Sequence, residues 1–215
     1  MAFSRTQIGL AGKNYYGLTS FSAITGAGLY NKENSSIGFG FSLENGGLIS
    51  NNLKLGFAHK LHPNFALGIS LNYTQLKTQD QYYTPTNTLS FSIGSYYQVN
   101  SQLNLGFNIN NPLQAKLNNN LQEMLPYSVG IGLDYLLNES TTLYGQLTQD
   151  EHYPINLSGG AELRYRDWQI RGGFGLNSSL GIGVGYTKSK FRVNVATNYH
   201  NVLGFSPSLD LNYEI

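Results

Sequence analysis

Strict alternation of apolar residues with glycine or polar residues constrains this chain more than any other feature. Successive side chains of a β-strand point to opposite faces, so an alternating run predicts a strand with one apolar and one polar face. The clearest runs are residues 180–186, 191–199 and 209–215, and weaker copies extend back to residue 37. A helical period appears only briefly, at residues 113–124, so the sequence predicts an all-β fold.

Turn residues divide the chain into about fourteen strands. Gly, Asn, Pro and charged residues mark the ends, and the second strand alternates poorly over residues 20–30. The expected strands are 5–13, 18–30, 35–44, 48–60, 64–76, 87–99, 102–110, 126–137, 141–149, 155–166, 168–176, 180–188, 190–199 and 206–215.

Short and long connections alternate along the chain. Tight polar turns are expected at 31–34, 62–64, 100–101, 138–140, 166–167 and 188–190, and the longer connections at 77–87, 111–125, 150–154 and 200–206. Short turns on one rim and longer loops on the other are typical of transmembrane β-barrels. The expected fold is therefore an up-and-down antiparallel barrel that forms a single domain over residues 1–215.

A soluble β-sandwich would also alternate, so three further features are needed to separate the two folds. Aromatic residues gather at strand ends, where membrane interfaces would lie. The polar face is rich in Gly, Ser and Asn, and only 12% of the 215 residues are charged, about half the usual share. The strands are also long enough for a tilted membrane crossing. These features favour the membrane barrel, with the sandwich as the alternative.

Composition excludes several other classes of protein. A net charge of +1 gives no electrostatic footprint for nucleic acid. The chain has no Cys, so it has neither a disulfide framework nor a thiolate metal site. No cofactor is expected.

Charged residues on the polar face should line the barrel interior. The expected inner-face charges are Glu44, Lys54, Asp134, Glu162, Arg164, Arg171, Arg192, Asp210 and Glu214. Six of these lie on neighbouring strands and predict a lumen charge network, namely Glu162, Arg164, Arg171, Arg192, Asp210 and Glu214. Such a network either stabilises the wall through paired charges or forms a constriction that selects solutes by charge.

Two of the longer loops carry candidate contact residues. Tyr82 and Tyr83 are paired aromatics among polar residues, and they suit either a binding role or the outer aromatic girdle. Leu117 and Leu121 lie at near-helical spacing in the loop 111–124. That loop could form a short amphipathic lid over the mouth or a docking surface.

No group of residues predicts catalysis. His59 and His62 have a possible metal-ligand spacing but no further ligands. The cluster Asp150 to His152 has acid–base groups but no nucleophile beside it, so it is interpreted as a solvated loop. The chain is therefore not expected to be an enzyme.

The C-terminal three quarters of the chain resemble a known family. The stretches NLGFNINNPLQAKL, LPYSVGIGLDYLL and the Gly-rich closing segment from residue 172 onward are similar to FadL-like outer-membrane barrels, particularly the PorV/PorQ-like members of Bacteroidetes-type bacteria. The resemblance covers residues 53–215 and implies a 14-stranded barrel in the bacterial outer membrane. It also implies a last strand, with Tyr213 and Ile215, that the barrel assembly machinery reads.

Members of this family either pass hydrophobic compounds or act as accessory proteins of type IX secretion. The chain departs from the pattern at its start, where neither a signal peptide nor a plug segment is recognised before the first strand. The leading expectation is therefore an accessory subunit of an outer-membrane assembly, with type IX secretion as the candidate process, in contact with outer-membrane lipid and with protein partners. The first alternative is a passive transporter for small or hydrophobic solutes, and the second is a soluble β-sandwich binding protein.

Overall fold

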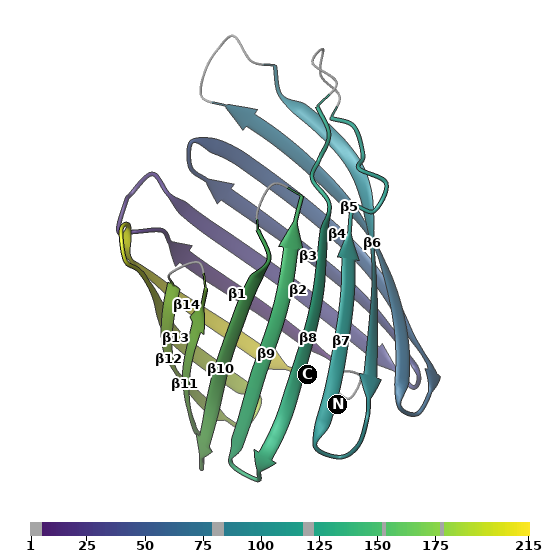
Figure 1. Ribbon diagram of the computed structural model, residues 1–215, viewed down its shortest axis with the longest axis vertical. Coiled ribbons are helices and arrows are strands. Elements are labelled where there is room, and N and C mark those ends of the chain that lie inside the picture. The colour runs from purple at the N-terminus through teal and green to yellow at the C-terminus, as the bar shows by residue number, and fades with distance from the viewer. Residues whose placement is uncertain (1–5, 79–83, 118–122, 152–153, 177–178) are drawn as a thin grey trace.

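A computed structural model describes residues 6–78, 84–117, 123–151, 154–176 and 179–215. In these ranges the chain forms fourteen strands and no helix long and apolar enough to cross a membrane (Figure 1). The strands are β1 (Gln7–Asn14), β2 (Ser22–Lys32), β3 (Ser35–Asn45), β4 (Leu48–His62), β5 (Phe65–Thr78), β6 (Thr86–Gln98), β7 (Leu103–Asn110), β8 (Ser128–Asn138), β9 (Thr141–Asp150), β10 (Asn156–Tyr165), β11 (Trp168–Gly175), β12 (Ser179–Lys188), β13 (Phe191–His200) and β14 (Gly204–Glu214).

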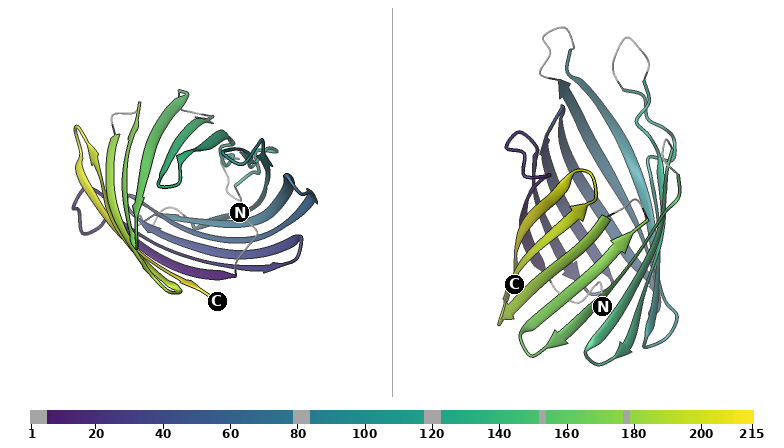
Figure 2. Two further views of the ribbon diagram at one scale, coloured as in Figure 1. Left: turned by 90° about the horizontal axis from the view of Figure 1, so that it is seen from below. Right: turned by 60° about the vertical axis from the view of Figure 1, so that its left-hand side comes forward.

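The sheet closes on itself into an up-and-down antiparallel barrel. Each strand pairs with its neighbours in the chain, and β1 pairs with β14 from Gln7 opposite Glu214 to Lys13 opposite Ser208. The view along the barrel shows the strands as a flattened ring (Figure 2). Closure leaves no free sheet edge, as a lipid environment requires, because unpaired backbone groups there cost several kcal/mol each. The predicted barrel is confirmed, and the β-sandwich is wrong.

The two faces of the wall differ sharply in chemistry. Large apolar side chains such as Leu55, Ile69 and Ile182 point outward and are more than half exposed. The apolar side chains buried among the described residues are few, namely Ala23, Ala66 and Leu117, whereas ten polar or charged residues are buried. The barrel therefore has its apolar surface outside and its polar surface inside, the arrangement of a barrel in lipid.

Aromatic pairs mark the short-turn rim. Trp168 packs on Tyr186 with ring centroids 4.9 Å apart, and Phe191 packs on Tyr213 at 4.7 Å. These pairs lie beside the turns 166–167 and 189–190, where an interfacial girdle would sit.

Two expectations about local structure need correction. The second strand begins at Ser22, because residues 15–21 form a turn in which the Tyr15 amide donates to the Phe21 carbonyl. The described ends of the loop 111–125 form an antiparallel bridge between Lys116 and Met124 rather than a helix. The near-helical spacing of apolar residues left a short amphipathic lid open, but hydrogen bonds between the two described ends of the loop, such as that from the Leu125 amide to the Ala115 carbonyl, pair their backbones.

Candidate functional site in the barrel lumen

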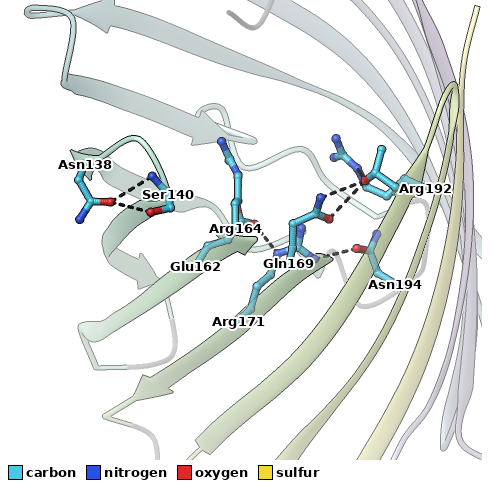
Figure 3. Close-up of polar contacts among 9 residues, drawn as sticks. Asn138, Ser140, Glu162, Arg164, Gln169, Arg171, Arg192 and Asn194 are labelled. Atoms are coloured by element: carbon cyan, nitrogen blue, oxygen red, sulfur yellow. Dashed lines mark hydrogen bonds and ion pairs between the residues drawn. The ribbon is translucent and has the colours of Figure 1, made fainter. Parts of the chain in front are cut away.

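Glu162 organises the inner wall near the short-turn rim. Its side chain is 6% exposed and its two carboxylate oxygens accept hydrogen bonds from Arg164 Nε at 2.6 Å and Arg171 Nε at 2.5 Å (Figure 3). The register explains this meeting, because Glu162 on β10 lies opposite Arg171 on β11 and two residues from Arg164 on the same face. One buried carboxylate thus balances two guanidinium groups.

A chain of amides extends this cluster across β12 to β13 and β14. Arg171 Nη1 donates to Asn194 Oδ1 at 2.8 Å, and the Asn194 amide donates to Asp210. Asp210 also accepts from Asn212 Nδ2 at 2.8 Å. Gly185 on β12 leaves the space for this crossing, since a Cβ there would lie 2.7 Å from Gln169 Oε1 and 3.4 Å from Arg171 Nη1.

Arg192 and Glu214 stand beside this cluster rather than in its ion pairs. Arg192 Nε donates to Thr187 Oγ1 at 3.3 Å, and Gln169 Nε2 donates to the same oxygen at 3.0 Å. Glu214 lies opposite Gln7 in the β1–β14 register, and its backbone amide donates to the Lys190 carbonyl. Of the six expected network residues, the structure therefore brings Glu162, Arg164 and Arg171 into ion pairs, joins Asp210 to them through Asn194, and places Arg192 and Glu214 on adjoining strands.

The opposite wall, from β4 to β8, carries neutral polar side chains in hydrogen-bonded rows. Asn72 Nδ2 donates to Ser92 Oγ at 2.8 Å, and Thr74 Oγ1 donates to Asn52 Oδ1 at 2.8 Å. Asn110 on β7 is held by Ser128 on β8 in the same way, at 3.0 Å. These amides and hydroxyls give the wall a hydrophilic surface with few charges.

Three cavities lie beside β4 and have Lys54 in their lining. The largest has a volume of about 710 Å³ and reaches Glu44, Leu76 and Asp150 towards the long-loop end. A second, of about 400 Å³, continues to Ser36 and Ala58 next to the short-turn end. A third, of about 420 Å³, runs round to Asp210 and Asn212 on β14. Lys54 lines all three.

The loop candidates divide into those that the structure describes and those that it does not. Tyr82, Tyr83 and Leu121 lie outside the described residues. Leu117 is buried, 9% exposed, and its amide donates to the Glu123 carbonyl at 2.7 Å. Its side chain is therefore packed into the protein and does not present the exposed contact surface that the loop was expected to offer.

The two residues of the expected assembly signal lie at the end of the closing strand. Tyr213 faces outward and packs on Phe191, and the Ile215 amide donates to the Thr6 carbonyl at 2.9 Å. Ile215 is 63% exposed. This places both side chains on the apolar outer surface; recognition by the assembly machinery stays a prediction.

The weaker motifs gain no chemistry from the fold. His59 Nδ1 is hydrogen-bonded to Ser35 Oγ at 2.9 Å, and Glu151 accepts from Gln114 Nε2 at 2.6 Å. Across the described ranges no three His, Cys, Asp or Glu side chains gather in a way that could hold a metal ion. His152 lies outside those ranges.

Sequence reasoning placed Lys54 on the inner face but did not single it out, and it missed Asn194, Thr187 and Gln169 altogether. The missing signal was register. Asn194 and Gln169 are among many polar residues of the alternating pattern, and only the pairing of β11, β12 and β13 shows which of them reach Arg171 or Arg192.

Comparison with known proteins gives structural likeness but no sequence match. No known family profile and no curated protein matches the sequence. Among solved structures, the CymD monoaromatic hydrocarbon channel is 13% identical with a TM-score of 0.74, and the match covers 98% of this chain and 88% of that chain. The Ralstonia pickettii toluene transporter TbuX is 13% identical with a TM-score of 0.66, covering 98% of this chain and 89% of that one.

A third similar structure is a Pseudomonas aeruginosa FadL homologue, 10% identical with a TM-score of 0.70, for which the match covers 98% of this chain and 90% of that chain. Identities this low show the fold alone. These comparisons do not show the more specific expectation of a PorV/PorQ-like protein from Bacteroidetes-type bacteria. The chain has the fold of the FadL-type outer-membrane channels, and this fold, with its apolar outer surface, supports the predicted location in the bacterial outer membrane.

Proposed function

We propose that this barrel is a passive outer-membrane channel for small solutes. The supporting observation is a pair of adjoining cavities within the closed wall, which share Lys54, Ser92 and Asn110 and together extend from Ser50 and Asp150 at one end to Ala58 at the other. Along β4 the step from Ser50 to Ala58 corresponds to about 26 Å of strand. Because strands of such barrels tilt by about 35–45°, this segment rises about 20 Å along the barrel axis, which is most of the roughly 25 Å height of the apolar band.

The neighbouring structures favour transport over an accessory role, since their titles describe channels and transporters. The solute class is a separate question. Those titles name monoaromatic hydrocarbons and toluene, whereas the wall around Lys54 here consists largely of Ser, Asn, Thr and Gly. A buried hydroxyl or amide that loses water to an apolar solute is left partly unsatisfied, so this lining favours hydrophilic solutes.

Liposome swelling tests the proposal. Purified protein refolded into liposomes is expected to admit small neutral sugars at rates that fall as the sugar becomes larger, and planar bilayers should show stepwise conductance. Parallel uptake of toluene into the same liposomes compares the two solute classes. Swelling and conductance equal to those of protein-free membranes, together with no added toluene uptake, would refute a channel function.

The accessory role in a secretion assembly has less support, because no observation on the described residues points to it. We propose that the barrel lies in outer-membrane lipid, is inserted by the barrel assembly machinery and contacts other outer-membrane proteins. Crosslinking in native membranes tests for stable partners, and depletion of the assembly machinery should lower the amount of folded barrel. Recovery of the barrel as a lone monomer would argue against a subunit role.

A further inference from the structure

Lys54 lies on the lumen wall and has no ion-pair partner among the described residues. It lies on the inner face of β4, midway between Ser50 and Ala58, and its side chain is exposed to the interior. Among the residues that the structure describes, none forms an ion pair or hydrogen bond with its ammonium group. By contrast, Arg164 and Arg171 share the carboxylate of Glu162.

The positions that pair with Lys54 and those diagonal to it are neutral, although the carboxylates of Glu44, Asp150 and Asp210 also line cavities that Lys54 lines. Gly40 on β3 and Asn72 on β5 lie directly opposite it. The diagonal positions on the same face are Gly38, Ser42, Ser70 and Thr74. The nearest carboxylate along β3 is that of Glu44, four residues from Gly40, or about 13 Å of strand, and it accepts a hydrogen bond from Ser42 Oγ at 3.1 Å.

A second group near Lys54 is suited to an anion. Ser92 lines two of the cavities that Lys54 lines, and its Oγ accepts a hydrogen bond from Asn72 Nδ2. Within the described part of the chain, the Ser92 hydroxyl has no acceptor for its own proton. An oxygen of a small anion held at the Lys54 ammonium could accept this proton, so charge and hydrogen bonding act together there.

From these observations we propose that Lys54 and Ser92 form an anion-binding point midway along the lumen, so that the channel prefers small hydrophilic anions. The inference rests on the proposed channel function and adds a solute class to it. A positive charge in a polar cavity attracts anions and repels cations of the same size, and the low-dielectric walls strengthen this effect. The aromatic hydrocarbons of the structural neighbours offer no charge for such a group.

Ion selectivity in planar bilayers is the first test. Wild-type protein in a potassium chloride gradient is expected to pass chloride in preference to potassium, and Lys54→Gln should lower the chloride-to-potassium permeability ratio about threefold to tenfold. Lys32→Gln is the matched control, because Lys32 lies on the short-turn rim with its side chain on the outer face. An unchanged ratio in Lys54→Gln would overturn the inference.

A second test does not require conduction. The chain has no Cys, so Ser70→Cys places a single thiol on the diagonal position beside Lys54, and Ser42→Cys does so on the other side. An anionic methanethiosulfonate should modify either thiol faster than a cationic one of similar size, and adding Lys54→Gln should lower this rate ratio about threefold to tenfold. A ratio that does not depend on Lys54 refutes the anion-binding point.

The two tests separate the two proposals. Wild-type membranes without conductance, combined with a thiol rate ratio that depends on Lys54, would refute the channel and leave the anion-binding point standing. Conductance in wild-type membranes, combined with an ion selectivity and a thiol rate ratio that do not depend on Lys54, would support the channel and refute the anion-binding point.

Discussion

Glu162→Gln tests whether one carboxylate holds the inner wall of β10 and β11 together. Gln has nearly the same shape as Glu, so the substitution removes the charge and one of the two hydrogen-bond acceptors without opening a cavity. Arg164 and Arg171 then face each other without the anion that accepts from both. The physical question is how much of that loss water can recover.

The geometry sets the size of the effect. A hydrogen bond to a charged group contributes roughly 1.5–3 kcal/mol, and the variant loses one such bond and weakens the other. The Glu162 side chain is only 6% exposed, whereas those of Arg164 and Arg171 are 51% and 35% exposed. Because water can reach both guanidinium groups, the full cost of breaking a buried pair does not apply. We expect the free energy of unfolding to fall by about 2 kcal/mol.

Two arginine variants extend the test, because the relative size of their effects on stability is also predicted. Arg164→Met removes a half-exposed partner and should cost roughly 0.5 kcal/mol. Arg171→Met also removes the hydrogen bond to Asn194 and should cost roughly 1.5 kcal/mol. Loss of Glu162 should therefore be the most damaging change and loss of Arg164 the least.

Urea unfolding in detergent micelles or lipid provides the assay. Trp168 is the only tryptophan and begins β11, the strand that carries Arg171, so its fluorescence reports on this part of the wall. A Glu162→Gln midpoint equal to that of the wild type would refute the reasoning. Equal losses in the two arginine variants would refute the assigned role of Asn194.

Three further tests concern the faces, the packing and the turns of the barrel. Ser158 lies on the inner face and the adjacent Leu157 on the lipid face. In liposomes, water-soluble thiol reagents should therefore modify Ser158→Cys and leave Leu157→Cys unmodified. Equal reactivity would contradict the assignment of faces. Gly160→Ala should destabilise the barrel by about 1–3 kcal/mol, because its Cβ would lie 3.0 Å from the Gly172 carbonyl oxygen. Gly172→Ala is the control and should be near neutral in the same urea titration, because its Cβ would meet nothing within 4 Å. Ser189 has a φ of 56°, so Ser189→Gly should raise the free energy of unfolding by up to roughly 1 kcal/mol. A decrease would show that the turn is not strained.

Residue alternation alone was enough to predict the strands and their faces. Residues 180–186 show why: each second side chain is apolar, and Leu180, Ile182 and Val184 all point to the outer surface. A strand has a period of two, so the identity of each face follows from local sequence. Near-helical spacing was a poor guide at the described ends of the loop 111–125, where Lys116 and Met124 form an antiparallel bridge.

The candidate site was predictable only in part. Its charged members lie on the polar face of the alternating pattern, and Glu162, Arg164 and Arg171 were expected to meet. Asn194 could not be identified, because its contact with Arg171 crosses β12 above Gly185 and depends on the register of three strands. Leu117 could not be recognised as buried for a similar reason.

The chain's sequence alone therefore determined which side chains face lipid and which face the interior, because that choice repeats every two residues along each strand. The tertiary structure decided which interior groups meet. The register from β11 to β14 joins Arg171 through Asn194 to Asp210, and the register of β3, β4 and β5 leaves Lys54 among glycine, serine and asparagine. These contacts join residues on different strands, so they depend on strand pairing and no local pattern encodes them.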